Sequence, residues 1–251
     1  MDHGTLRVRL WANFGRLQTL LGGHTGPGRV IERGGLVASV VPRAPDSPTL
    51  NAAVAIEPDR AIENLEELAD RYKAAGVRRW GVWLDASAQQ AAQALADAGL
   101  TVTASSPGMG AAIEDLLGPP PHTTPTPADL TTVGRVNDLA YGNHDARLER
   151  TLAPLPNDIL KGFRADLPDG TPGAVAMTLQ HDDDCGVSFV ATIPDARRKG
   201  LATIVMQQAL VEARSDGCTT TTLQATDVGE RLYLRLGYRR LCEMQLWERR
   251  R

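Results

Sequence analysis

The sequence predicts an α+β fold, with a mixed sheet of the α/β type, arranged as two units in tandem. Segments with strand character alternate with segments whose apolar residues recur at helical spacing along the 251 residues. A proline-rich stretch interrupts this alternation close to the middle of the chain. The landmarks of the first half return in the same order in the second half, which favours two copies of one fold over one large domain.

The interruption at residues 118–127 holds five prolines in ten residues. Proline lacks a backbone N–H and fixes φ, so such a stretch cannot run through a helix or the interior of a sheet. We therefore predict a semi-rigid linker at 118–127, between a first unit, 1–117, and a second unit, 128–251. Each unit has the size of an ordinary domain.

Glycines and apolar spacing define the predicted elements of the first unit. Gly34 and Gly35 indicate a turn between two extended segments, and Gly76 and Gly99 each follow a helical pattern and end it. The predicted elements, in chain order, are a short helix near 13–21, two extended segments within 29–41, a strand at 50–56, a helix at 62–75, a strand at 77–84, an alanine-rich helix at 87–98 and the final strands within 101–113.

The second unit repeats much of this order. The predicted elements are a helix at 128–141, strands at 173–179 and 187–193, a helix at 201–215, a strand at 219–226, a helix at 228–236 and a last strand at 240–247. The run from His181 to Asp184 resembles a set of metal ligands, but its place between two strands predicts a solvated turn instead.

The sequence also repeats itself locally. Residues 54–59 read Val-Ala-Ile-Glu-Pro-Asp, and residues 190–195 read Val-Ala-Thr-Ile-Pro-Asp. Pro58 precedes Gly99 by 41 positions, and Pro194 precedes Gly237 by 43. A difference of two over so long a stretch indicates an internal duplication.

Composition excludes several classes of protein. The 27 basic and 30 acidic side chains give a net charge of −3, which is not the balance of a dedicated nucleic-acid binder. The apolar run at the start of the chain is broken by arginines, and no stretch approaches a membrane span, so we expect a cytoplasmic protein with no membrane or nucleic-acid partner. Cys185, Cys218 and Cys242 are widely spaced and predict neither a disulfide framework nor a metal site.

One loop of the second unit has the character of an anion site. Residues 197–202, Arg-Arg-Lys-Gly-Leu-Ala, lie between a predicted strand and the start of a predicted amphipathic helix. The first turn of a helix offers free backbone N–H groups and the positive end of its dipole, which together suit a pyrophosphate. Gly200 permits a close approach of the backbone to a ligand. Three basic side chains precede the helix, where the positive end of the dipole disfavours cations, so their presence favours a bound anion.

This loop resembles the acetyl-CoA signature of the GCN5-related N-acetyltransferases (GNAT), in which Arg-x-x-Gly-x-Ala follows a strand. The segment Leu232-Tyr233-Leu-Arg-Leu-Gly-Tyr238, about 35 residues downstream, is similar to the second hallmark of that family. The resemblance covers roughly residues 128–247. It implies two GNAT-like domains in tandem, a mixed sheet in each, and transfer of an acetyl group from acetyl-CoA to an amine without a metal.

The resemblance also implies roles for single residues. The strand before the loop should splay from its neighbour and pair with the pantetheine arm, and Tyr233 should act as general acid toward the departing thiolate. The implied acetyl-CoA site consists of Val190, Ala191, Thr192, Arg197, Arg198, Lys199, Gly200, Leu201 and Ala202.

The general base stays open, because residues 187–190 contain no carboxylate. Ser188 could position a water, and the other candidates for the acceptor cleft are Asp138, Tyr141, His144 and Asp145.

The first unit departs from the motif. Residues 60–64 contain neither glycine of the loop, Glu63 carries the wrong charge, and Leu95 stands where the second unit has Tyr233. We expect a degenerate copy that could wall the acceptor cleft. The sequence therefore predicts an N-acetyltransferase, monomeric or homodimeric, acting on a primary amine of a small molecule or amino-acid derivative. The alternative is a non-catalytic module that binds acyl-CoA or a regulatory partner.

Overall fold

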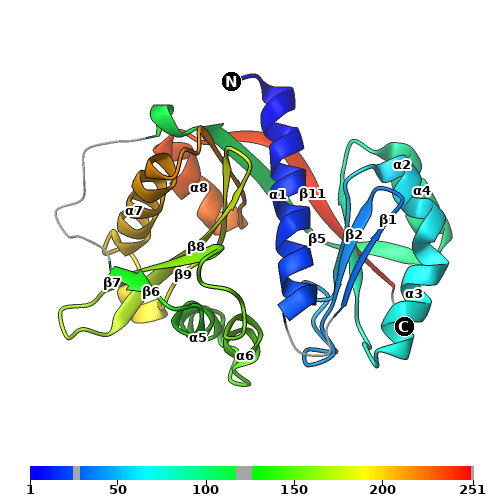
Figure 1. Cartoon of the computed structure of the whole chain (residues 1–251), viewed down its shortest axis with the longest axis horizontal. Helices are drawn as coiled ribbons and strands as arrows, with labels where there is room; N and C mark the ends of the chain where they lie inside the picture. Colours follow the sequence, from blue (N-terminus) through cyan, green and yellow to red (C-terminus); the bar gives the residue numbers. More distant parts are fainter. Residues whose placement is uncertain (25–28, 117–125, 250–251) are drawn as a thin grey trace.

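A computed structural model describes residues 1–24, 29–116 and 126–249. Their strands form one sheet of eleven strands in the order β1-β2-β3-β4-β11-β5-β10-β9-β8-β7-β6 (Figure 1). The predicted mixed α/β-type sheet with helices is confirmed. The predicted linker lies outside the described residues up to residue 125, while residues 126 and 127 already belong to β6, at the edge of the sheet where a proline is tolerated.

The first half of the chain carries five strands and four α-helices within the described residues. In order they are α1 (His3–His24), β1 (Arg29–Arg33), β2 (Leu36–Val40), β3 (Ala52–Ala55), α2 (Pro58–Ala61), the 3-10 turn η1 (Ile62–Asn64), α3 (Leu65–Ala74), β4 (Gly81–Asp85), α4 (Gln89–Asp97) and β5 (Leu100–Ala112). Helix α1 is much longer than the predicted 13–21, and the predicted final strands are one strand of 13 residues.

The second half contains the elements that surround the predicted loop. The first half ends with the 3-10 turn η2 (Ile113–Asp115). The elements of the second half are, in order, β6 (Thr126–Ala128), α5 (Leu130–Tyr141), α6 (Arg147–Leu152), β7 (Leu160–Asp166), β8 (Pro172–His181), β9 (Asp184–Thr192), the 3-10 turn η3 (Pro194–Ala196), α7 (Leu201–Ser215), β10 (Thr220–Gln224), α8 (Asp227–Leu236) and β11 (Arg239–Arg249). The prediction missed β6, α6 and β7.

The two halves share one order of strands. In the first half β2 is antiparallel to β3, and β3 is parallel to β4; in the second half β8 is antiparallel to β9, and β9 is parallel to β10. The internal repeat of the sequence predicts this correspondence. That the first half is a degenerate copy stays a prediction.

The last strand of each half lies in the other half's part of the sheet. Strand β11, at the end of the chain, pairs with β4 on one side and β5 on the other. Strand β5 in turn pairs with β10, antiparallel. The two halves are thus joined through a continuous ladder of backbone hydrogen bonds and not through side-chain packing alone.

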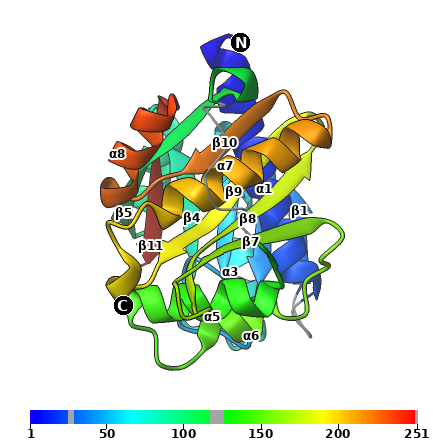
Figure 2. The ribbon, with the colours of Figure 1, turned by 90° about the vertical axis from the view of Figure 1, so that its left-hand side faces the viewer.

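Helix α1 lies between the two halves and contacts strands of both (Figure 1). Its buried residues recur at helical spacing: Leu10 and Trp11 pack on β3 and β11, while Leu17 and Leu21 pack against α5 and β8. Helices α7 and α8 cover β9, β10 and β5 on the other face of the sheet, and Figure 2 shows α7 in front of these strands. This arrangement leaves the face of β9 and β10 that lies toward α1 as the floor of a cavity.

Candidate active site

Strands β9 and β10 part in the middle of the sheet. Their parallel pairing ends at Val187 and Leu223, although β9 continues to Thr192. A register shift against β8 falls at this point, and Phe189 has a φ of +52°, which a bulge in β9 accommodates. Beyond Val187 the backbone of β9 has no strand partner on the β10 side, so it can pair with an extended ligand.

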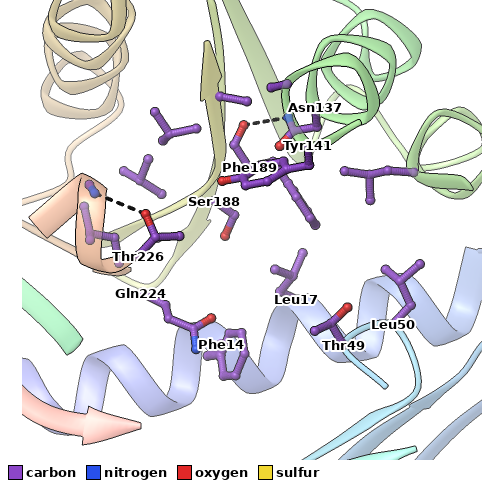
Figure 3. A pocket seen from close by; sticks show the side chains of 18 of the residues that line it. Phe14, Leu17, Thr49, Leu50, Asn137, Tyr141, Ser188, Phe189, Gln224 and Thr226 are labelled. Carbon is purple, nitrogen blue, oxygen red and sulfur yellow. Dashed lines mark hydrogen bonds between the residues drawn. The ribbon is translucent and has the colours of Figure 1, made fainter. Parts of the chain in front are cut away.

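Helix α5 holds this bulge in place. The side chain of Asn137 is buried, and its Nδ2 donates to the carbonyl oxygens of Phe189 and Val133, at 2.9 Å each (Figure 3). Asp129 caps the start of the helix by accepting from the backbone N–H of Thr132 at 2.6 Å. The bulge is therefore positioned by a well-defined helix and does not depend on the loop beyond it.

The predicted anion loop leads into the first turn of α7. Gly200 is the N-cap with a φ of +79°, no side chain caps the helix, and its first turn contains no acidic residue. Its leading N–H groups are therefore open to a ligand. Arg198 and Lys199 are exposed, and among the ion pairs of the described residues neither side chain takes part.

Arg197 has a different place in the loop. Its guanidinium donates to the carbonyl oxygen of Ala140 at 3.0 Å and to that of Thr192 at 3.3 Å. These bonds tie the end of α5 to the end of β9, beside the parted strands. The geometry therefore favours Arg198 and Lys199 as the charges available to phosphates.

Tyr233 lies on α8, whose N-cap Thr226 accepts from the N–H of Gly229 at 3.1 Å. The ring is buried and meets Tyr238 edge to face, with centroids 5.7 Å apart. Burial raises the pKa of the Tyr233 phenol well above its ordinary value, with a smaller contribution from Tyr141. The phenol therefore keeps its proton at neutral pH and can donate it.

A cavity of about 820 Å³ joins these features to the first half of the chain (Figure 3). One wall is formed by β9, β10 and α8, and the opposite wall by α1 and residues 47–50. Figure 3 shows Phe14, Leu17 and Leu50 facing Ser188 and Phe189 across the space. The cavity contains the parted strands at one side and a wall contributed by the first half at the other.

The structure brings most of the predicted residues together. Six of the ten predicted site residues line the cavity: Val190, Ala191, Thr192, Arg197, Ala202 and Tyr233. Residues 198–201 lie in the adjoining loop, outside its lining. Among the candidates for the acceptor cleft, Ser188, Asp138 and Tyr141 line the cavity, whereas His144 and Asp145 do not.

Asp138 is not free to act as a base. Its carboxylate accepts from the backbone N–H groups of Leu148 and Glu149, at 3.0 Å each, and so caps α6. It is the only carboxylate among the described residues that line the cavity.

Sequence reasoning suggested that the first half could wall the acceptor cleft, but it identified none of the residues that do so. Asn13, Phe14, Leu17, Thr49 and Leu50 line the cavity, but they lie more than 130 residues before the loop. Their apolar spacing marks them as one face of a helix and a neighbouring segment, and nothing in the pattern relates them to β9.

The prediction of a solvated turn at 181–184 is wrong for its last residue. Asp184 belongs to β9 and is 1% exposed. Its carboxylate accepts from the hydroxyls of Thr222 and Thr220, at 2.6 and 2.7 Å, and from Nδ2 of Asn13 at 3.1 Å. Burial raises the pKa of Asp184 despite these hydrogen bonds. The pattern of four polar residues could not show that the strand begins at the last one.

A comparison with family models matches residues 157–238 to the acetyltransferase (GNAT) family. This segment runs from the start of β7 through α8 and includes the parted strands, the loop at 197–202 and Tyr233. Residues 157–238 therefore match a GNAT domain. Such a domain indicates an N-acetyltransferase enzyme that uses an acyl-CoA donor.

Solved structures resemble the chain well beyond the GNAT domain. A GCN5-related N-acetyltransferase from Kribbella flavida is 22% identical, with a TM-score of 0.68 over 96% of this chain and 95% of the other. One from Sphaerobacter thermophilus is 15% identical, with a TM-score of 0.55 over 86% and 80%. A tandem GNAT protein from the clavulanic acid biosynthesis pathway is 11% identical, with a TM-score of 0.55 over 87% and 81%.

At these identities the likeness is one of fold. It extends beyond residues 157–238 to nearly the whole chain, and a tandem GNAT protein is among the structures that share the fold. A search of curated proteins with the sequence found no match. Within the described ranges, no helix is long and apolar enough to cross a membrane, and no group of three or more His, Cys, Asp or Glu side chains is placed to hold a metal ion.

Proposed function

We propose that the protein transfers an acetyl group from acetyl-CoA to a primary amine of a small molecule or amino-acid derivative, with the GNAT domain as the catalytic part. One observation carries this proposal. The part of β9 that β10 leaves unpaired lines one cavity together with Ala202, in the open first turn of α7, and the buried ring of Tyr233. A pyrophosphate, an extended arm and a reacting thioester need these three environments in this order.

The loop and β9 would bind the donor. The pyrophosphate would accept hydrogen bonds from the N–H groups of the first turn of α7, with Arg198 and Lys199 adding charge at the rim. The pantetheine arm would pair with the backbone of residues 190–192, on the side of β9 that β10 leaves free. Binding along a strand edge would extend the thioester toward Ser188 and Tyr233, which line the same cavity.

The reaction would proceed by direct attack. The nitrogen of the neutral amine bonds to the thioester carbonyl carbon, the carbonyl oxygen gains negative charge, and a backbone N–H of β9 at the bulge donates to it. The C–S bond then breaks, and the thiolate takes the proton of Tyr233. The amine's proton passes to water, for which Ser188 offers a hydroxyl in the cavity, and a proton from solvent restores the phenol of Tyr233.

The binding step is tested by a substitution in the loop. Gly200→Glu places a carboxylate at the start of α7, in open space, so we expect acetyl-CoA affinity to fall by at least about 100-fold through like-charge repulsion. Gly99→Glu is the matched control, because Gly99 has a φ of +81° and is equally open but lies after α4. Equal affinity of the two variants by titration calorimetry would show that the phosphates bind elsewhere.

The chemical step is tested at the phenol. Tyr233→Phe keeps the buried ring and removes only its hydroxyl group, the proposed proton donor, so we expect kcat to fall by about 100-fold or more while acetyl-CoA affinity changes little. Thiol release with a panel of primary amines measures it. An unmodified protein that binds acetyl-CoA but releases no thiol with any amine would favour the alternative, a non-catalytic acyl-CoA module. The lack of a free carboxylate in the cavity lining is the observation behind that alternative.

A further inference from the structure

The wall of the cavity opposite β9 is apolar. Phe14 and Leu17 of α1 line it together with Leu50 and Trp83 (Figure 3). The ring of Phe14 packs edge to face on that of Trp83, with centroids 5.8 Å apart, which fixes the shape of this wall. An acceptor that enters the cavity therefore meets hydrocarbon and aromatic surface on the side away from acetyl-CoA.

The polar side chains on this wall are those of Asn13, Gln18, Ser47 and Thr49. The hydroxyls of Ser47 and Thr49 lie 3.2 Å apart and hydrogen-bond to each other. Nδ2 of Asn13 donates to Asp184 and to the carbonyl oxygen of Leu179, and Oε1 of Gln18 accepts from the hydroxyl of Ser39 at 2.6 Å. Both side chains are buried. They are poorly placed to hold a charged group of a ligand, because doing so would break buried hydrogen bonds.

The charges that line the cavity disfavour a second ammonium. Among the described lining residues, the charged side chains are those of Asp138, Arg147 and Arg197. The carboxylate of Asp138 caps α6, and Arg197 is bound to backbone carbonyls. Nε of Arg147 lies 3.3 Å from Oδ2 of Asp145, a residue outside the cavity lining. Two guanidiniums and no free carboxylate face the space, so a cationic tail would lose water without gaining a partner.

We infer that the acceptor is a monoamine carried on an uncharged apolar skeleton, and that α1 of the first half selects it against diamines, polyamines and lysine-rich peptides. The inference rests on the proposed function for the place where the amine reacts. The specificity itself rests on the apolar wall and its lack of an anion.

A matched pair of amines tests the inference. Hexylamine and hexamethylenediamine have the same six-carbon chain and differ by one terminal ammonium. We expect kcat/KM for thiol release to be at least about tenfold higher with hexylamine, and its affinity for the CoA-bound protein to be higher by a similar factor. Equal or reversed values for turnover or binding would overturn the inference. If neither amine reacts yet hexylamine binds more tightly, the proposed function fails and the specificity of the cavity stands.

A negative charge introduced on α1 by substitution provides a second test of the inference. Phe14→Asp adds an anion to the wall, so we expect the preference for hexylamine to fall at least about tenfold. Val8→Asp is the control, because Val8 is 70% exposed on the same helix and does not line the cavity. Phe14→Leu, which keeps the wall apolar, covers the case in which Phe14→Asp does not fold, and it should keep the preference. A folded Phe14→Asp with the unmodified preference, or a Phe14→Leu that favours the diamine, would refute the inference.

Discussion

A contact between α1 and β9 gives a quantitative test of how the two halves fit together. Gly186 lies on β9 directly against Asn13, and a Cβ built there would overlap Oδ1 and Cγ of Asn13 and lie 2.7 Å from its Nδ2. The φ of Gly186 is not in the left-handed region, so the effect of Gly186→Ala is one of space alone. We expect a loss of about 1–3 kcal/mol in the free energy of unfolding, the range for overpacking of a core.

Asn13→Ala removes the side chain that causes the overlap. It also removes hydrogen bonds to the carbonyl oxygen of Leu179 and to the carboxylate of Asp184, each 3.1 Å long, so we expect it to cost about 2–4 kcal/mol. In that background Gly186→Ala fills the vacated space and should cost less than about 0.5 kcal/mol.

The double-mutant cycle isolates the contact. The coupling between the two substitutions should be about 1–3 kcal/mol, with the double variant more stable than the sum of the single effects predicts. Urea unfolding followed by circular dichroism measures all four proteins, and equal m-values show that the comparison is valid. Additive effects, within about 0.5 kcal/mol, would refute the close packing of α1 on β9.

Three further predictions concern charge and the exchange of strands. Asp184 has a raised pKa in the folded protein, so its contribution to stability is greatest below its pKa in the unfolded chain and is lost as pH rises above about 4. The urea midpoint of the unmodified protein should therefore fall as pH rises through this range, and that of Asp184→Asn should lack this fall. Arg197→Gln should lower the urea midpoint and leave the salt dependence of acetyl-CoA affinity unchanged. Lys199→Gln should do the reverse: it should reduce the salt dependence of acetyl-CoA affinity and leave the urea midpoint unchanged. Residues 126–251 expressed alone lack β5 and should not unfold cooperatively, whereas co-expression with residues 1–116 should restore a folded complex that binds acetyl-CoA.

Much of the fold was predictable because its signals are local. Gly76 and Gly99 have positive φ at the ends of α3 and α4, and Gly237 has a φ of +99° at the end of α8, as helix stops require. Strand β7 was missed because its seven residues mix Lys161, Gly162 and Arg164 with apolar neighbours. Neither local spacing nor the repeat could show that β5 and β11 exchange places, since strand order depends on contacts distant in sequence.

The residues proposed to bind the donor lie in two short segments of sequence, and those that form the opposite wall do not. The loop at 197–202 and the segment at 232–238 are each local patterns, so the amino-acid sequence alone could single them out. The wall from α1 depends on how the two halves meet. A buried carboxylate such as Asp184 is also invisible in a run of four polar residues, because burial is a property of the neighbours.

The exchange of strands makes the first half part of the sheet that carries the candidate site. Without β5, strand β10 would present an unpaired edge beside the site, and β11 would lose its partner on one side. The same half also brings α1 against β9, where Phe14 and Leu17 line the wall of the cavity opposite β9. In the proposed reaction the donor binds along β9 and the loop at 197–202, which contain none of these wall residues, so substitutions on α1 should change the acceptor without disturbing the loop. A fold that divides the proposed donor site and acceptor wall between two halves in this way can alter one while keeping the other.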